Sequence, residues 1–172
     1  MLISIKSPFI PLLFKQKLVE SEKKVGYLKA TRFLGRIKGN KSYEVKYKQN
    51  RIKIIEGKTE NGKRRWGIVE LNENEEKEIG SLFLVSSAKE TLSRGITEYE
   101  VKYDTVIYHV NKPFMHQKNY CELKNESNKI IAKHQEQDIL RWRRDIKVEE
   151  ETLNERDIAV CVLVLSLIIF IS

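Results

Sequence analysis

Apolar and polar residues alternate with a period of two over much of the region between residues 40 and 150, which is the pattern of strands with one buried face. The clearest case is residues 43–54, in which two alternating runs flank Gln49 and Asn50. Asn50 tolerates a positive φ, so these two residues are expected to form the turn of a β-hairpin.

Further short runs in this region are also expected to be strands, and they are separated by residues that favour turns. They cover residues 65–71, 80–86, 97–103, 105–110, 120–123, 129–134 and 139–149. Residues 1–14 are read as a first strand followed by a loop at 7–11, whereas residues 19–35 fit a helix or a strand. Many short strands at close spacing predict an antiparallel barrel or sandwich.

The end of the sequence has a different pattern, because residues 158–172 contain 15 residues without a charge. This run is too long for one ordinary strand. As a helix it extends about 22 Å, which is short for a bilayer core of about 30 Å. A helix that is apolar on every face belongs in a protein core or in lipid.

Three structures remain open for this run: a buried core helix, a membrane anchor and a buried pair of strands. Asp157 is placed to cap the N-terminus of such a helix. The many β-branched residues are poor helix formers, so burial has to override their propensity.

Length and composition bound the domain organisation. The 172 residues suffice for one well-buried domain, and 41% of them are hydrophobic against 33% charged, a globular mixture. We therefore expect a single domain over residues 1–172. Two cysteines cannot supply a disulfide framework, and the N-terminus lacks the features of a secretory signal, so a cytoplasmic location is expected.

Basic residues are concentrated in the first third of the chain. Residues 1–66 hold 18 basic and 5 acidic residues, a charge of +13, so the remainder carries −5 of the total of +8. The expected hairpin places Lys48 opposite Arg51 and Lys46 opposite Lys53 on its outer face. This surface, extended by a second basic run, is the candidate site for anions; its seven residues are Lys46, Lys48, Arg51, Lys53, Lys63, Arg64 and Arg65. A solvated lysine-rich face is the alternative.

Chemistry-bearing motifs are weak throughout the sequence. The histidines and Cys121 have no recognisable metal-ligand spacing. No Gly-x-Ser-x-Gly motif or phosphate-binding glycine loop is present, and Cys161 lies in the apolar run. We therefore expect a protein that is not an enzyme and needs no metal or cofactor. The basic run at residues 141–144 surrounds Trp142, which is better explained as packing than as a nucleic-acid contact.

Short strands followed by one very hydrophobic C-terminal helix form an unusual order of elements. Residues 129–172 carry a likeness through the segments 130–133, 142–148 and 157–159. With this order the chain resembles the tubby C-terminal-like superfamily, which includes tubby proteins, phospholipid scramblases and the LURP-one-related proteins, the last being closest. The resemblance implies a closed antiparallel β-barrel of about twelve strands around a central hydrophobic C-terminal α-helix.

Two functions from different classes follow. The first is a non-catalytic tubby-like domain at the cytoplasmic face of a membrane, where its basic face binds anionic phospholipid headgroups or a protein partner. The alternative is a tail-anchored membrane protein with residues 158–172 as the membrane segment. A small-molecule substrate conflicts with a helix that fills the barrel, and no aromatic-rich recognition strand supports a nucleic-acid partner.

Overall fold

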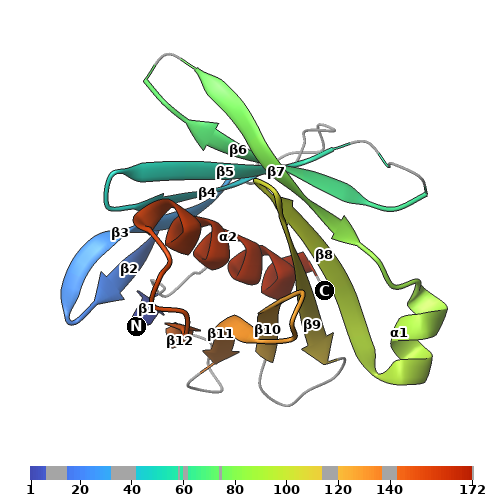
Figure 1. Ribbon diagram of the computed structural model, residues 1–172. Coiled ribbons are helices and arrows are strands. Elements are labelled where there is room, and N and C mark those ends of the chain that lie inside the picture. Colours follow the sequence, from blue (N-terminus) through green and yellow to red (C-terminus); the bar gives the residue numbers. More distant parts are fainter. Residues whose placement is uncertain are drawn as a thin grey trace.

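The computed structural model of the protein describes residues 1–6, 15–31, 42–57, 59, 62–73, 75–113, 120–136 and 143–171. In these residues, twelve strands form one closed antiparallel β-barrel, and a long helix, α2, passes through its interior (Figure 1). The expected barrel of about twelve strands around a C-terminal helix is therefore confirmed.

The strands follow one another along the chain with one short helix among them. The elements are β1 (Leu2–Lys6), β2 (Gln16–Glu20), β3 (Lys23–Thr31), β4 (Ser42–Tyr47), β5 (Asn50–Glu56), β6 (Arg65–Leu71), β7 (Glu76–Leu84), α1 (Ala88–Arg94), β8 (Ile96–Tyr103), β9 (Val106–Pro113), β10 (Tyr120–Asn125), β11 (Ile130–Glu136), β12 (Arg143–Val148) and α2 (Glu155–Ile171).

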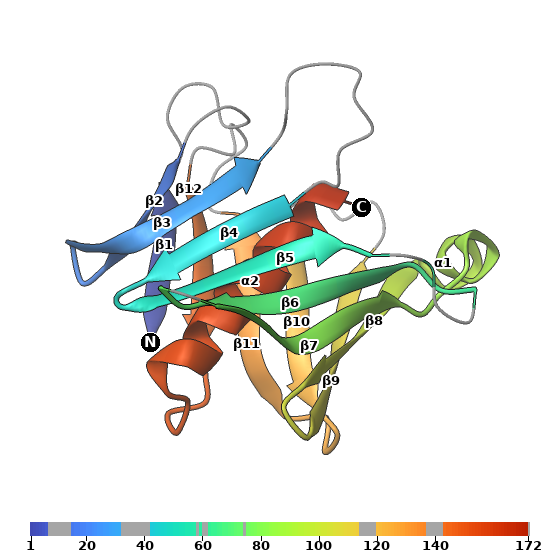
Figure 2. The same cartoon turned by 90° about the horizontal axis from the view of Figure 1, so that it is seen from above.

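Each strand pairs with the strands next to it in sequence, and the barrel closes between β1 and β12, where Leu2 lies opposite Lys147. Figure 2 shows the neighbouring strands β3 to β7 side by side above α2. Closure pairs both sides of every strand, so the barrel has no open edge that another chain could extend.

Burial explains why residues 155–171 form a helix despite their β-branched composition. The side chains of residues 158–169 are all at most 9% exposed. They pack against the inward-facing residues of the surrounding strands, such as Ile3, Val45, Ile52 and Leu123. Because α2 is apolar on every face, an all-round apolar environment stabilises it more than its intrinsic propensity disfavours it.

Three local expectations are resolved or corrected. Residues 19–35 fitted a helix or a strand, and their described part contributes the β2 and β3 strands. The expected first strand is β1, and the loop expected at residues 7–11 lies outside the described residues. The helix α1 was not anticipated, although Ser87, Glu90 and Gly95 carry its start and stop signals.

The N-terminal cap of α2 is Asn154 rather than Asp157. The side-chain oxygen of Asn154 accepts hydrogen bonds from the backbone N–H groups of Arg156 and Asp157, at 2.9 and 3.0 Å. Asp157 returns the contact by accepting from the backbone N–H of Asn154 at 3.2 Å. Asp157 is therefore the third helical residue of a reciprocal cap, which satisfies otherwise unpaired N–H groups.

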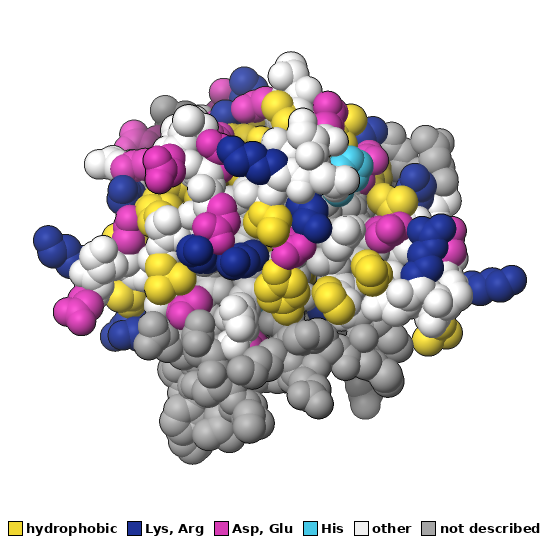
Figure 3. Space-filling view, turned by 60° about the horizontal axis from the view of Figure 1, so that its bottom comes forward, with side chains coloured by type: hydrophobic (Ala, Val, Ile, Leu, Met, Phe, Trp, Pro, Cys, Tyr) yellow, Lys and Arg dark blue, Asp and Glu magenta, His cyan; other side chains and the backbone are white. Residues whose placement is uncertain are grey.

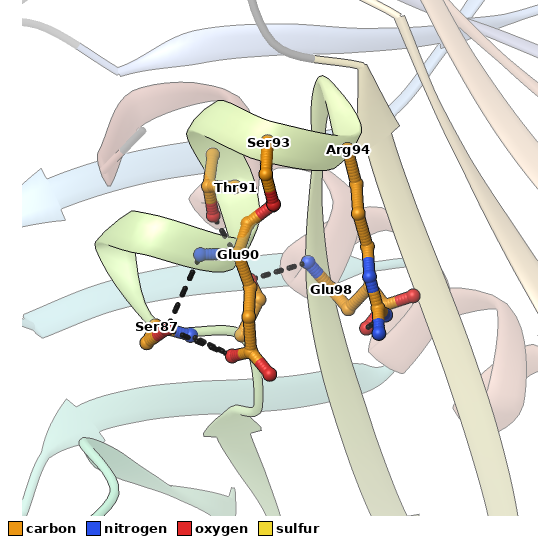
Figure 4. Close-up of polar contacts among 7 residues, drawn as sticks. Ser87, Glu90, Thr91, Ser93, Arg94 and Glu98 are labelled. Atoms are coloured by element: carbon orange, nitrogen blue, oxygen red, sulfur yellow. Dashed lines mark hydrogen bonds and ion pairs between the residues drawn. The ribbon is translucent and has the colours of Figure 1, made fainter.

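The short helix α1 is fixed by a capping box (Figure 4). The Ser87 hydroxyl accepts from the backbone N–H of Glu90, and the Glu90 carboxylate accepts from the backbone N–H of Ser87 at 2.8 Å. The backbone N–H and the hydroxyl of Ser87 both donate to this carboxylate, and these two bonds hold the pKa of Glu90 below its usual value. At the other end Gly95 adopts φ 68°, which ends the helix.

Replacing Ser87 by alanine is expected to lower the free energy of unfolding by about 1 kcal/mol, because the helix loses the capping bond that the Ser87 hydroxyl accepts and the bond that it donates to Glu90. Chemical denaturation of the two proteins measures the difference. Ser93→Ala is a matched control, since the Ser93 hydroxyl only donates to the Glu90 carbonyl within the helix. A loss as large for Ser93→Ala as for Ser87→Ala would contradict the role of the cap.

Candidate functional site

The hairpin that carries four of the seven candidate residues has a different register from the expected one. Tyr47 pairs with Asn50, so the turn is formed by Lys48 and Gln49, and Lys48 rather than Asn50 adopts a positive φ of 52°. Alternation fixes which face each residue takes, but it does not fix the register, because a shift by two residues keeps every face. The inward and outward faces are therefore as expected.

The corrected register changes which charges oppose one another on the outer face. Lys46 lies opposite Arg51, and Lys53 lies opposite Glu44. Arg51 also forms an ion pair with Glu44, with 2.9 Å between Nη2 and Oε1. The outer face of the hairpin therefore has a lower local positive charge than it has in the expected register, in which four cations lie opposite one another.

Most of the candidate cations have acidic partners. The pairs are Arg51–Glu44, Lys48–Glu155 (2.9 Å), Lys53–Glu76 (3.8 Å), Arg64–Glu56 (2.7 Å) and Arg65–Glu78. The Arg64 and Arg65 pairs belong to the far end of β5 and β6, about 16 Å along the strand from Arg51 at about 3.3 Å per residue. The seven residues are therefore not one surface; of them, Lys46 and Lys63 are exposed and have no acidic partner among the described residues.

A more continuous basic surface runs across β1 to β4. Adjacent positions in the sheet are Lys6 opposite Lys17, Lys17 opposite Tyr27, and Tyr27 opposite Lys46. Lys6, Lys17 and Lys46 are exposed, since each follows or precedes an inward-facing residue of its strand. With neighbouring strands about 4.8 Å apart, the row spans about 14 Å.

A fifth side chain extends this row. The ammonium group of Lys15, just before β2, lies 4.4 Å from the centre of the Tyr27 ring, a cation–π distance. We call Lys6, Lys15, Lys17 and Lys46 the lysine row; among the described residues none of the four has an acidic partner. Sequence analysis found only Lys46, because residues 15–18 were assigned to no element and residues 19–35 were left open between helix and strand. The alternation of Lys17 with Gln16 and Leu18 was the available signal.

Tyr27 is fixed in the middle of the row by Glu44. The Tyr27 hydroxyl donates to Glu44 Oε1 at 2.9 Å, the same oxygen that pairs with Arg51. Burial raises the pKa of Tyr27, and the bond to Glu44 adds to the rise. Partial burial opposes ionisation of Glu44, but the bonds from Arg51 and Tyr27 outweigh it and lower its pKa. Glu44 therefore compensates Arg51 and leaves the lysine row uncompensated.

The wall formed by β10 to β12 has a different charge arrangement. Lys124 pairs with Glu122 at 2.8 Å, while Lys133 and Lys147 share Glu149 at 3.1 and 3.0 Å. Figure 3, which brings this side of the barrel forward, shows basic and acidic side chains interspersed with hydrophobic ones. These three lysines are thus paired with nearby carboxylates, unlike those of the lysine row.

The N-terminal end of α2 is held at one end of the barrel by polar contacts. Arg156 Nε bonds to Glu70 at 2.9 Å, and Arg156 Nη1 lies 3.3 Å from Asp104. The Tyr103 hydroxyl donates to Asp157 at 2.9 Å. Together with the pair between Lys48 and Glu155, these contacts fix the helix in its place, so Lys48 has a structural partner rather than a free charge.

Beside α2 lies a small, mostly apolar cavity lined by residues that include Tyr103, Tyr108, Leu123 and Cys161. Its volume of about 10 Å³ is close to what a single water requires. Burial raises the pKa of the Cys161 and Cys121 thiols to about 12. Both thiols are therefore protonated at neutral pH, which does not suit nucleophilic chemistry.

Polar side chains also occupy inward positions at the end of the barrel that lies away from the N-terminus of α2. Sequence analysis did not anticipate them. They are Gln16, Lys112, His134, Glu136 and Arg144, each at most 8% exposed. Arg144 donates to the side-chain carbonyl of Gln16, and Glu136 lies opposite Arg144 in the sheet. Of the basic run at residues 141–144, Arg144 thus faces the interior; Trp142 lies outside the described residues.

Within the described part of the chain, no group of three or more histidine, cysteine, aspartate or glutamate side chains is arranged to hold a metal ion. No helix in the same residues combines the length and apolar character needed to cross a membrane. The lysine row is accordingly the strongest candidate site, and its chemistry is that of a surface for anions.

The fold defines the structural class of the protein as a closed twelve-stranded antiparallel barrel with a C-terminal helix inside it. No protein-family model, curated protein or solved structure matches the chain.

Proposed function

We propose that this protein is a non-catalytic barrel domain of the tubby C-terminal-like superfamily, closest to the LURP-one-related proteins, that binds anionic phospholipid headgroups. Its place of action is the cytoplasmic face of a membrane, where anionic lipids are concentrated. The order of elements, twelve strands followed by a buried apolar helix, supports the superfamily assignment.

The observation that carries the binding proposal is the lysine row. Four exposed ammonium groups lie on neighbouring strands or over the ring between them, and no carboxylate among the described residues pairs with them. Like charges on adjacent strands are mildly destabilising, so an anionic partner that binds the four lysines relieves their mutual repulsion. Each lysine near an anionic membrane contributes on the order of 1 kcal/mol.

Sedimentation with lipid vesicles tests this proposal. The full chain is expected to bind vesicles that contain phosphatidylserine, to ignore pure phosphatidylcholine, and to be released by salt, because screening weakens the attraction. The double variant Lys17→Gln/Lys46→Gln neutralises two lysines of the row. It is expected to lose about 2 kcal/mol of binding free energy, so that its affinity for these vesicles falls about thirtyfold.

A control with the same change in charge is Lys77→Gln/Lys89→Gln, since both lysines are exposed and lie on β7 and α1, away from the row. This control is expected to bind like the parent protein. Equal losses in the two double variants would show that only net charge matters and would remove the lysine row as the site. Binding to a nucleic acid but not to anionic vesicles would reject the membrane proposal.

A further inference from the structure

The lysine row crosses the side wall of the barrel rather than encircling one of its ends. Strands in a closed barrel tilt by about 35–45° to its axis, so a row perpendicular to the strands runs obliquely along the wall. The ends of the row confirm this direction. Lys46 precedes Tyr47, which is the last residue of β4 and pairs with Asn50 across the β4–β5 turn. Lys6 is the last residue of β1.

The two ends of the barrel can be told apart by their contacts with β1. Met1 lies at the same end as Tyr47, because its sulfur is 3.7 Å from the Tyr47 hydroxyl. Lys6 is five residues further along β1, about 16 Å away at about 3.3 Å per residue. The lysine row therefore extends from the end at the N-terminus of α2 toward the opposite end.

The end of the barrel at the N-terminus of α2 is less suited to an anionic surface than the lysine row is. Glu20, Glu70, Asp104, Glu155 and Asp157 gather there, as shown by their contacts with Tyr47, Arg156, Lys48 and Tyr103. Two of the cations at this end, Lys48 and Arg156, are paired with these carboxylates, and Lys23 lies opposite Glu20 in the sheet. An anionic bilayer that approaches this end therefore meets carboxylates close to the cations, which weakens the attraction relative to that of the lysine row.

Resting on the proposed function, we infer that the barrel docks on its side, with the wall of β1 to β4 against the bilayer. Lys6, Lys15, Lys17 and Lys46 then contact headgroups together, and the ring of Tyr27 lies among them. The helix α2 stays inside the barrel, roughly along the membrane surface, and does not point its apolar residues into the lipid. Because the four lysines are spread over separate strands, several headgroups share the contact.

Acetylation of lysines at trace levels, followed by mass spectrometry, tests the orientation with the unmodified full chain. The protein is labelled alone, with phosphatidylcholine vesicles, and with vesicles that also contain phosphatidylserine. Only the last are expected to slow labelling severalfold at Lys6, Lys15, Lys17 and Lys46. Lys89 and Lys102, on α1 and β8, are internal controls and are expected to react at unchanged rates.

The outcomes separate this inference from the function on which it rests. Protection confined to Lys48 and the Met1 amine, with Lys6 and Lys17 unchanged, would place an end of the barrel on the bilayer and overturn the sideways docking while membrane binding stands. Slower labelling at Lys89 and Lys102 would place the wall that includes α1 and β8 on the bilayer and would overturn docking through β1 to β4. A chain that does not sediment with anionic vesicles would overturn both the inference and the proposed function.

Discussion

Leu163→Glu is expected to abolish the cooperative thermal transition of the protein. Leu163 lies in the middle of α2 and is fully buried. A glutamate there loses the burial of the leucine and brings a carboxylate into an apolar interior. Single changes of this kind cost more than about 4 kcal/mol, a large part of the 5–15 kcal/mol by which a domain is stable.

The matched control is Leu92→Glu, the same substitution at a helical leucine that is 68% exposed. It is expected to change the free energy of unfolding by less than about 1 kcal/mol. Circular dichroism during heating compares the two variants with the parent chain. If Leu163→Glu unfolds at the parent temperature, α2 does not belong to the core in solution. A parent chain that needs detergent would in that case support the tail-anchored alternative.

The second large effect is expected at Gly26, where β3 passes unusually close to β4. A Cβ atom at this position would lie 1.8 Å from the backbone carbonyl oxygen of Lys46, a separation that backbone atoms cannot accommodate. Gly26 is beside the register shift between Leu18 and Val19 on β2, a local irregularity that draws the strands together. Gly26→Ala is therefore expected to cost about 3 kcal/mol or more, since β3 must move away from β4.

Gly57→Ala supplies the comparison for this glycine. A Cβ at Gly57 has its nearest neighbour, the Arg65 carbonyl oxygen, at 3.4 Å, which is ordinary contact. Urea denaturation of both variants measures the two free energies of unfolding. The substitution at Gly57 is expected to stay within about 1 kcal/mol of the parent. Similar losses of unfolding free energy at both positions would mean that the close approach of β3 and β4 is not the reason why a glycine is needed at position 26.

Alternation predicted many short antiparallel strands, in a barrel or a sandwich, and the charge-free run indicated a buried helix as one of three alternatives. The closed barrel around a central helix was expected from the resemblance, and the structure confirms it. Alternation and the charge-free run are both signals of burial, and burial is set by which face of a strand or helix is apolar. Register was not predictable in the same way. Moving the turn from Gln49–Asn50 to Lys48–Gln49 keeps Val45 and Ile52 inside, so the apolar pattern cannot distinguish the two arrangements.

The candidate site was harder to predict than the fold because it depends on partners that are distant in sequence. Lys48 is neutralised by Glu155, 107 residues away, and Lys53 by Glu76. Lys6 and Lys17 become neighbours of Lys46 only through the pairing of four strands. Local charge density identified the basic first third of the chain, but the order of strands decides which of its cations are left uncompensated.

The pairing of β1 with β12 also has a consequence for synthesis of the chain. The amine of Met1 donates to the carbonyl of Val148, 147 residues away, so the first strand waits for its partner until nearly the whole chain has left the ribosome. The helix that fills the barrel emerges later still. Until the helix emerges, the apolar inner faces of all twelve strands lack their final packing, and such nascent chains expose surfaces that associate with one another. Production of this protein should therefore depend on chaperones during translation more strongly than its modest length suggests.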